Sequence, residues 1–132
     1  MLFRSLVAGV VLTVEGEGRA EADADQVRQA LINVVQNAAQ AGARRVDVRL
    51  REVEGVVEVV VEDDGQGIQA EDLGRIGEPF FTTKAAGTGL GVAIARQIVE
   101  DHDGRMVLER RPEGGTRVVV RLPRERARAE GS

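Results

Sequence analysis

Apolar residues recur at helical spacing in the first third of the chain. They occupy every third or fourth position, at Val27, Leu31, Val34, Val35, Ala38 and Ala39. Asp23 stands three residues before Gln26, which resembles a capping box whose carboxylate accepts the free amides of a first helical turn. Gly42 then provides a C-terminal stop. Together these features predict a helix over residues 24–41.

Several other stretches alternate apolar and polar residues, which is the period of a strand with one face in water. Residues 46–51 and 57–62 alternate in this way on either side of Glu54-Gly55, so we expect a hairpin. Its second strand leads directly into the acidic, glycine-rich loop at residues 63–67. The same period predicts a last pair of strands, through Met106, Leu108, Val118, Val120 and Leu122.

A second helix is predicted between the two pairs of strands. Apolar residues there return to helical spacing, at Leu90, Val92, Ala93, Ile94, Ala95 and Ile98. We expect this helix to begin at Thr88 and to end near Asp101, since Gly104 follows. The stretch from residue 68 to the start of this helix has little regular period, which is typical of a loop with a functional role.

The chain opens on an apolar stretch, residues 1–14, whose composition resembles a signal or membrane segment. Arg4 and Ser5 interrupt this stretch and Glu15 ends it, so it is shorter than the ~20 residues that a membrane-spanning helix needs. We therefore expect a buried strand here, with residues 10–15 as its clearest part.

The length of 132 residues suits a single domain. We expect this domain to cover residues 1–123, and the charged stretch 124–132, which lacks an apolar repeat, to be a disordered tail. The net charge of −4 argues against general binding to nucleic acid. The absence of cysteine excludes thiolate nucleophiles and cysteine-based zinc sites. We expect a monomeric, cytoplasmic domain without membrane contact.

Two asparagines lie four residues apart on the first predicted helix, and therefore on one face of it. Asn33 or Asn37 alone would be an ordinary solvated or capped residue. As a pair in an otherwise apolar stretch they indicate a binding site. An amide oxygen is a hard, neutral ligand that suits Mg²⁺ beside substrate phosphates.

The loop Asp63-Asp64-Gly65-Gln66-Gly67 contains the pattern Asp-x-Gly-x-Gly at the end of a predicted strand. A simple turn is one interpretation of this pattern. In the other interpretation, a carboxylate accepts a hydrogen bond from an exocyclic amine while the glycines let a flat ring approach the main chain.

A second glycine cluster, Gly87-Thr88-Gly89-Leu90-Gly91, opens the second predicted helix, where main-chain amides can bind an anion. The cluster matches neither the Rossmann fingerprint nor the Walker motif. Before it, the only lysine of the chain, Lys84, follows Phe80, Phe81 and Thr83. A solvated charge beside a small hydrophobic anchor would explain this segment. So would a hinged lid that places the lysine over phosphates.

Taken in chain order, Asn33–Asn37, Asp63–Gly67, Phe80–Lys84 and Gly87–Gly91 resemble the N, G1, F and G2 boxes of the histidine-kinase catalytic domain. That domain belongs to the superfamily of gyrase, Hsp90 and MutL ATPases, and the resemblance covers nearly the whole chain. It implies the Bergerat-type ATP-binding fold, an α/β (α+β) two-layer sandwich. Helices would cover one face of a mixed, mostly antiparallel sheet. The implied function is to bind Mg²⁺ and ATP and to donate the γ-phosphate to a histidine.

The resemblance also assigns residues to roles. Asn37 matches the asparagine that ligates Mg²⁺, and Asp63 matches the aspartate that reads the adenine amino group. Asn33 and Lys84 are our catalytic candidates, with Lys84 replacing a cationic contact that Gln40 does not supply. The other candidates for ATP binding are Gly65, Gly67, Thr83, Gly87, Thr88, Gly89, Leu90, Gly91 and Thr116.

Two residues favour transfer of the phosphate to another protein. One argues against ATP hydrolysis, and the other argues against phosphorylation of this chain itself. At the position of Asn33, gyrase-like ATPases have a glutamate base, and an amide cannot accept a proton at neutral pH. His102 is the only histidine of the chain, and the segment around it, residues 100–104, resembles a structural turn of the family. The expected partners are therefore the helical dimerisation and phosphoacceptor domain of a longer sensor, which can be membrane-anchored, and a downstream response regulator. The alternatives are a serine kinase of the anti-sigma-factor type and a non-catalytic docking module.

Overall fold

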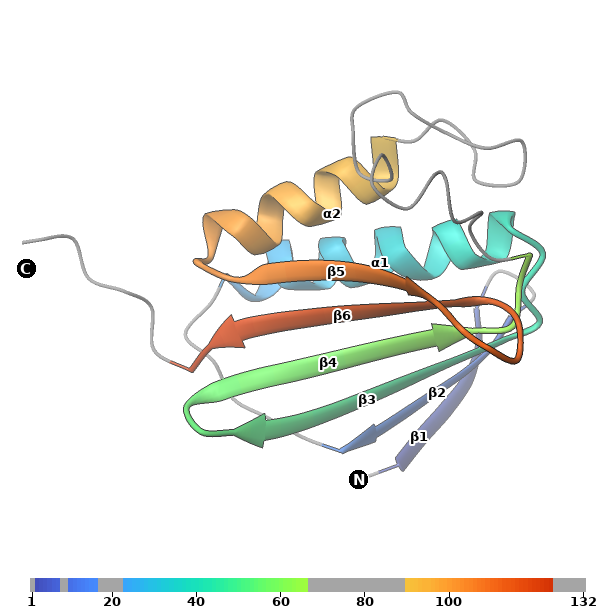
Figure 1. Ribbon diagram of the computed structural model, residues 1–132, viewed down its shortest axis with the longest axis horizontal. Coiled ribbons are helices and arrows are strands. Elements are labelled where there is room, and N and C mark those ends of the chain that lie inside the picture. Colours follow the sequence, from blue (N-terminus) through green and yellow to red (C-terminus); the bar gives the residue numbers. More distant parts are fainter. Residues whose placement is uncertain (1, 8–9, 17–22, 67–89, 125–132) are drawn as a thin grey trace, which may run out of the picture.

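The computed structural model describes residues 2–7, 10–16, 23–66 and 90–124. It is a two-layer α+β sandwich in which two helices cover one face of a single sheet (Figure 1). The elements in chain order are β1 (Leu2–Val7), β2 (Val10–Gly16), α1 (Ala24–Gln40), β3 (Arg45–Val53), β4 (Val56–Asp63), α2 (Leu90–Asp101), β5 (Arg105–Arg110) and β6 (Thr116–Pro123). This architecture confirms the predicted fold class. Within the predicted tail at 124–132, every residue after Arg124 lies outside the described ranges.

The sheet has six strands in the order β1-β2-β3-β4-β6-β5. Only β2 and β3 run parallel, and the other neighbouring strands are antiparallel, so the sheet is mixed and mostly antiparallel as predicted. The β3–β4 hairpin turns at Glu54 and Gly55, whose φ angles are +50° and +81°. Positive φ at both central turn residues suits the right-handed twist of the strands that they join.

The beginning of the chain differs from the prediction of one strand. It forms an antiparallel pair, with Leu2 opposite Glu15 and Val7 opposite Val10. Both strands are mostly apolar, and Gly9 is the only glycine between them. The reversal therefore leaves almost no signal in the hydrophobic pattern.

Helix α1 follows its prediction closely. The Asp23 carboxylate accepts hydrogen bonds from the main-chain amides of Asp25 and Gln26, at 3.0 and 3.1 Å. These bonds satisfy two of the amides that a first turn leaves without partners. The helix ends at Gln40, one residue before the predicted end, and Gly42 adopts a φ of +84°.

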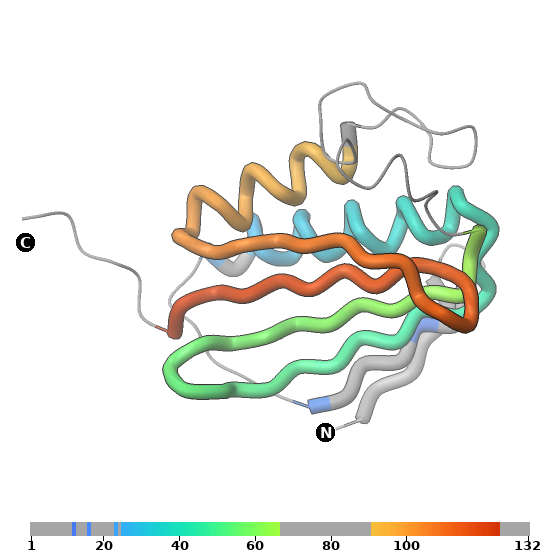
Figure 2. The backbone as a smooth tube through the Cα atoms, in the orientation of Figure 1, coloured from blue at the N-terminus to red at the C-terminus, as the bar shows by residue number. Residues whose placement is uncertain are grey.

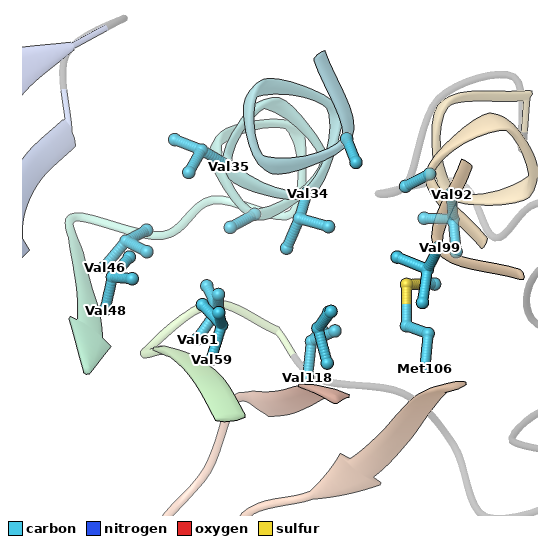
Figure 3. Packing of buried hydrophobic residues seen from close by; sticks show 14 of the residues in the cluster. Val34, Val35, Val46, Val48, Val59, Val61, Val92, Val99, Met106 and Val118 are labelled. Carbon is cyan, nitrogen blue, oxygen red and sulfur yellow. The ribbon is translucent and has the colours of Figure 1, made fainter. Parts of the chain in front are cut away.

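The core lies between the helices and the covered face of the sheet. Figure 3 shows Val34 of α1 pointing toward strand valines such as Val61, while Val99 of α2 lies near Met106. Val46 and Val61 are at most 1% exposed. Burying each such valine side chain contributes about 1.5–3 kcal/mol.

Three chain segments meet at one edge of the sandwich (Figure 2). They are the C-terminal end of α1, the end of β4 and the turn between β5 and β6. The main-chain amide of Gln66, after β4, donates to the carbonyl of Ala41, after α1, at 2.9 Å. The candidate site residues from the first half of the chain gather along this edge and along α1.

Candidate functional site

The loop after β4 turns the Asp63 side chain inward. Asp63 is 7% exposed, and its Oδ1 accepts a hydrogen bond from the main-chain amide of Gly65 at 2.8 Å. A second main-chain hydrogen bond comes from Thr116, the first residue of β6, which is also 7% exposed. Two of the residues predicted to bind ATP, Gly65 and Thr116, are therefore in contact with the buried carboxylate of Asp63.

Gly65 occupies a place that no larger residue fits. A Cβ added there would lie 2.9 Å from the carbonyl oxygen of Ala41 and 3.1 Å from Oδ1 of Asp63. The loop main chain consequently lies directly on the end of α1. Glycine at this position therefore permits the loop to pack against the end of α1. The predicted approach of a flat ring to this loop stays a prediction.

The neighbouring carboxylate, Asp64, has a different task. Its Oδ1 accepts hydrogen bonds from the main-chain amides of Arg44 and Arg45, at 2.8 and 3.0 Å. Partial burial opposes ionisation, but these hydrogen bonds outweigh it and hold the pKa of Asp64 below its ordinary value. Asp64 thus fastens the loop to the turn before β3, and Asp63 remains as the carboxylate for a ligand.

Burial raises the pKa of Asp63, and the negative charge of Asp64 adds to this effect. The main-chain hydrogen bonds from Gly65 and Thr116 and the positive charge of Arg111 act in the opposite direction. An ionised carboxylate has about four lone-pair sites, so those two hydrogen bonds leave Asp63 able to accept more. A donor group of a ligand would strengthen the ionised form further.

Asn33, in the middle of α1, lies close to Gly91 of α2. It is 8% exposed, and its Oδ1 accepts a hydrogen bond from Nε2 of Gln29 at 2.9 Å. A Cβ added at Gly91 would lie 3.9 Å from both the Cβ and the main-chain oxygen of Asn33. The structure therefore brings Asn33 and the last glycine of the second cluster together. With its oxygen engaged, Asn33 retains an amide group that donates and cannot act as a base.

Asn37 lies one helical turn after Asn33 and is half-buried. Its carbonyl accepts a hydrogen bond from the amide of Ala41 at 3.1 Å, and its side chain makes no recorded hydrogen bond to another described residue. From Asn33 to Ala41, α1 extends over about 12 Å. Helix α1 thus runs from Asn33, beside Gly91, toward the loop that contains Asp63, with Asn37 between them.

Several predicted site residues lie outside the described residues. They are Gly67, Thr83, Lys84, Gly87, Thr88 and Gly89, so the predicted lid and most of the second glycine cluster stay predictions. Leu90 is the first described residue of the second helix, and the predicted start at Thr88 lies outside the described residues. The helix ends at Asp101 as predicted.

The described residues of this site offer few ligands for Mg²⁺. No group of three or more acidic, histidine or cysteine side chains gathers within the described ranges. Asn37 supplies one neutral oxygen, which fits an ion that keeps several waters and takes most of its charged ligands from substrate phosphates. The residues present fit Mg²⁺ only together with a phosphate-bearing ligand.

Sequence reasoning missed a second set of contacts at Asp63. Arg111 donates from Nη1 to the carbonyl oxygen of Asp63 at 2.6 Å. Gly115, at a φ of +90°, lies so close that an added Cβ would be 1.9 Å from the same oxygen. The two residues are 48 or more positions from Asp63, so no local pattern could reveal them. The Gly114-Gly115 pair was the only signal, and it indicated a turn.

A groove elsewhere on the molecule lies away from this site. It has a volume of about 590 Å³ and lies on the uncovered face of the sheet, lined by Gly16, Arg49, Leu50, Arg51, Glu58, Val60, Glu109, Arg117, Val119 and Arg121. None of the predicted site residues lines it. The Asp63 site is the better candidate because it combines a buried carboxylate acceptor with two other predicted site residues, Gly65 and Thr116. Other predicted site residues lie within residues 67–89, outside the described ranges.

The family described as histidine kinase-, DNA gyrase B- and HSP90-like ATPase matches residues 22–126. The chain belongs to this family. No helix in the described part of the chain is long and apolar enough to cross a membrane.

Curated relatives place the chain among sensor histidine kinases. Histidine protein kinase DivJ of Caulobacter vibrioides is 42% identical over an alignment of 130 residues, which covers 91% of this chain and 22% of that protein. Sporulation kinase A of Bacillus subtilis is 40% identical over 105 residues, which are 78% of this chain and 17% of that protein. The chain thus corresponds to about a fifth of the length of these two relatives.

Solved structures agree with the fold and the family. The catalytic domain of histidine kinase ThkA matches with a TM-score of 0.74 and 36% identity, covering 85% of this chain and 77% of that one. The mycobacterial sensor histidine kinase MprB matches with a TM-score of 0.71 and 31% identity, covering 86% and 84%. Within the ATPase family, the chain is homologous to the catalytic domains of sensor histidine kinases.

Proposed function

We propose that this chain binds Mg²⁺ and ATP and donates the γ-phosphate to a histidine on a separate helical dimerisation domain. A response regulator would then receive the phosphate from that histidine. We place the activity in the cytoplasm, where ATP is available. Membership of an ATPase family supports ATP binding, and the named relatives are histidine kinases.

The buried carboxylate of Asp63 carries this proposal. It accepts hydrogen bonds from the main-chain amides of Gly65 and Thr116 and keeps acceptor capacity beyond these two. An exocyclic amine, such as that of adenine, suits an acceptor of this kind because it brings two N–H donors. A guanine would present a carbonyl oxygen at the matching position, which a carboxylate repels.

The other proposed contacts follow α1 toward α2. Asn37 would hold Mg²⁺, which when bound would neutralise phosphate charge. The amides of the glycine cluster at 87–91 would bind the phosphates at the start of α2. Lys84 would lie over the same phosphates and supply the cation that Gln40 does not.

Phosphate transfer to a protein is favoured over hydrolysis by the character of Asn33. Its oxygen accepts from Gln29, and its amide nitrogen can only donate, so it cannot activate water. We propose that Asn33 orients the phosphates by donating a hydrogen bond. Slow hydrolysis keeps ATP intact until a phosphoacceptor arrives.

A transfer experiment in trans tests this function. The chain is mixed with the helical phosphoacceptor domain of its own parent kinase and with γ-labelled ATP and Mg²⁺. We expect slow, acid-labile labelling of the helical domain, because the effective concentration of a covalent link has been lost. A helical domain in which the acceptor histidine is replaced with alanine is the control.

The location of the label decides between the alternatives. Acid-stable label on a partner serine would support a serine kinase of the anti-sigma-factor type. Binding of ATP without transfer to any histidine-bearing helical domain would support a docking module. Acid-labile label on His102 of this chain, lost in H102A, would contradict the proposal of a separate acceptor.

A further inference from the structure

The guanidinium of Arg111 lies against the end of β4. Nη1 donates to the carbonyl oxygen of Asp63 at 2.6 Å, and the Arg111 side chain is 20% exposed. Nε lies 3.8 Å from Oε2 of Glu62 and 3.2 Å from Oε1 of Glu113, within ion-pair range of both but without a hydrogen bond to either. Arg111 thus connects the turn before β6 to the residue proposed to read adenine.

Arg111 is not needed to neutralise the carboxylate of Glu62. Glu62 already accepts from Arg49 and from Arg117, whose Nε lies 2.8 Å from Oε2. Burial opposes ionisation of Glu62, but these two guanidinium groups outweigh it and hold its pKa below the ordinary value. The contact that sets Arg111 apart is therefore its hydrogen bond to the Asp63 carbonyl.

The main chain around Arg111 makes this contact stiff. Its amide donates to the carbonyl of Gly115 at 3.1 Å, and its carbonyl accepts from the amide of Gly114 at 3.0 Å. This turn places Gly115 in close contact with the carbonyl oxygen of Asp63. The guanidinium of Arg111 donates to the same oxygen. Two parts of one turn thus fix a single peptide group.

We propose that Arg111 is a positioning residue of the adenine pocket, which holds the peptide at Asp63 so that the carboxylate faces the base. This inference rests on the proposed role of Asp63 as the adenine reader. Rotation of the peptide after Asp63 would move the amide of Gly65 away from the carboxylate and turn the side chain. The hydrogen bond from Arg111 resists that rotation.

Arg111 also affects the ionisation of the Asp63 carboxylate. The charged groups facing Asp63 in the described part of the site are Asp64, which disfavours its ionised form, and Arg111, which favours it. Glu62 faces the same guanidinium from β4. Loss of Arg111 leaves burial and Asp64 opposed only by main-chain hydrogen bonds. The pH needed to ionise Asp63 then rises.

The test compares R111A, R111K and the control R110A in the full chain. Arg110 is the exposed neighbour at the end of β5, so R110A removes the same charge without touching Asp63. Calorimetric titrations with ATP and with inosine triphosphate, which has a carbonyl in place of the 6-amino group, are run from about pH 5 to pH 8. D63N reports the loss of the reader itself.

We expect R111A to weaken ATP binding about tenfold, to reduce the preference for ATP over inosine triphosphate and to move the falling edge of ATP affinity to higher pH. R111K keeps the positive charge but lacks the planar guanidinium with its several donors. We therefore expect ATP affinity to fall at the same pH as in wild type, while the preference for ATP over inosine triphosphate is still reduced. R111K also serves if R111A does not fold. R110A should match wild type.

Two different failures are distinguishable. A wild-type chain without preference for ATP, unchanged by D63N, would overturn the proposed role of Asp63. A preference that D63N abolishes but that R111A and R111K leave equal to R110A would overturn the role of Arg111 alone.

Discussion

The imidazole of His102, at the end of α2, accepts a hydrogen bond at Nε2 from the main-chain amide of Asp23, the cap of α1, at 3.1 Å. Its Nδ1 donates to the carbonyl of Ile98 at 2.8 Å, and the residue is 3% exposed. Both ring nitrogens are thus engaged in joining the two helices. A phosphoacceptor needs a free imidazole nitrogen in line with the γ-phosphate, so this geometry gives His102 a structural role.

Replacement of His102 should therefore cost stability. H102A removes two buried hydrogen bonds and leaves the Asp23 amide without a partner, so we expect a loss of roughly 2–3 kcal/mol. H102N keeps a donor near Ile98 and should lose less. The measurement is chemical denaturation of each variant. An H102A protein as stable as wild type would contradict the helix-joining role.

Replacement of Asp63 should separate stability from binding. Because its folded pKa is raised, the ionised carboxylate opposes folding above that pKa, and the neutral amide of D63N removes this effect. We expect the Tm of the ligand-free chain to rise by roughly 2–5 °C at pH 7. ATP binding should weaken by about 1–3 kcal/mol. Differential scanning fluorimetry with and without ATP measures both, and D64N is the control that should lower the ligand-free Tm.

Glu62 predicts an acid-sensitive component of stability. Its folded pKa is lowered from 4.5, so its contribution is complete above about pH 4.5 and is lost as pH falls through the folded value. E62Q should therefore lower the Tm at pH 7 by roughly 5 °C, and its Tm should converge with that of wild type in more acidic solution. Thermal melts between about pH 3 and pH 7 test this. A constant difference across that range would exclude the linkage.

Two adjacent glycines offer a matched test of the turn against Asp63. Both have positive φ, at +103° for Gly114 and +90° for Gly115. A Cβ at Gly114 meets nothing within 4 Å, whereas one at Gly115 would lie 1.9 Å from the Asp63 carbonyl oxygen. We expect G114A to cost about 1 kcal/mol of stability from strain alone, and G115A at least roughly 2–3 kcal/mol together with ATP affinity. Equal effects of the two substitutions would contradict the close approach.

Local patterns predicted most of the fold. Helix α1, its Asp23 cap and the β3–β4 hairpin depend on residues within a few positions of one another, so period and turn residues suffice to place them. The strand predicted at residues 10–15 is β2, whereas β1 was missed because the pattern of the mostly apolar run at residues 1–14 indicates a single strand.

The site was predicted in part for the same reason. The Asp63 loop is one short motif that the sequence shows directly, and the structure buries its first carboxylate. The contacts of Arg111 with Asp63 and of His102 with Asp23 join residues 48 and 79 positions apart. Only the order of strands in the sheet and the packing of the two helices bring such residues together.

The titration of the wild-type chain with ATP, with Mg²⁺ and with a chelator in its place, tests the central claim most directly. N37A and the exposed neighbour Q36A serve as matched variants. We predict binding of modest affinity that Mg²⁺ strengthens, a nucleotide-dependent rise in Tm, and loss of the Mg²⁺ effect in N37A but not in Q36A. An absence of binding heat and of any rise in Tm, in a folded wild-type chain with Mg²⁺ present, would contradict the assignment of this chain as an ATP-binding catalytic domain.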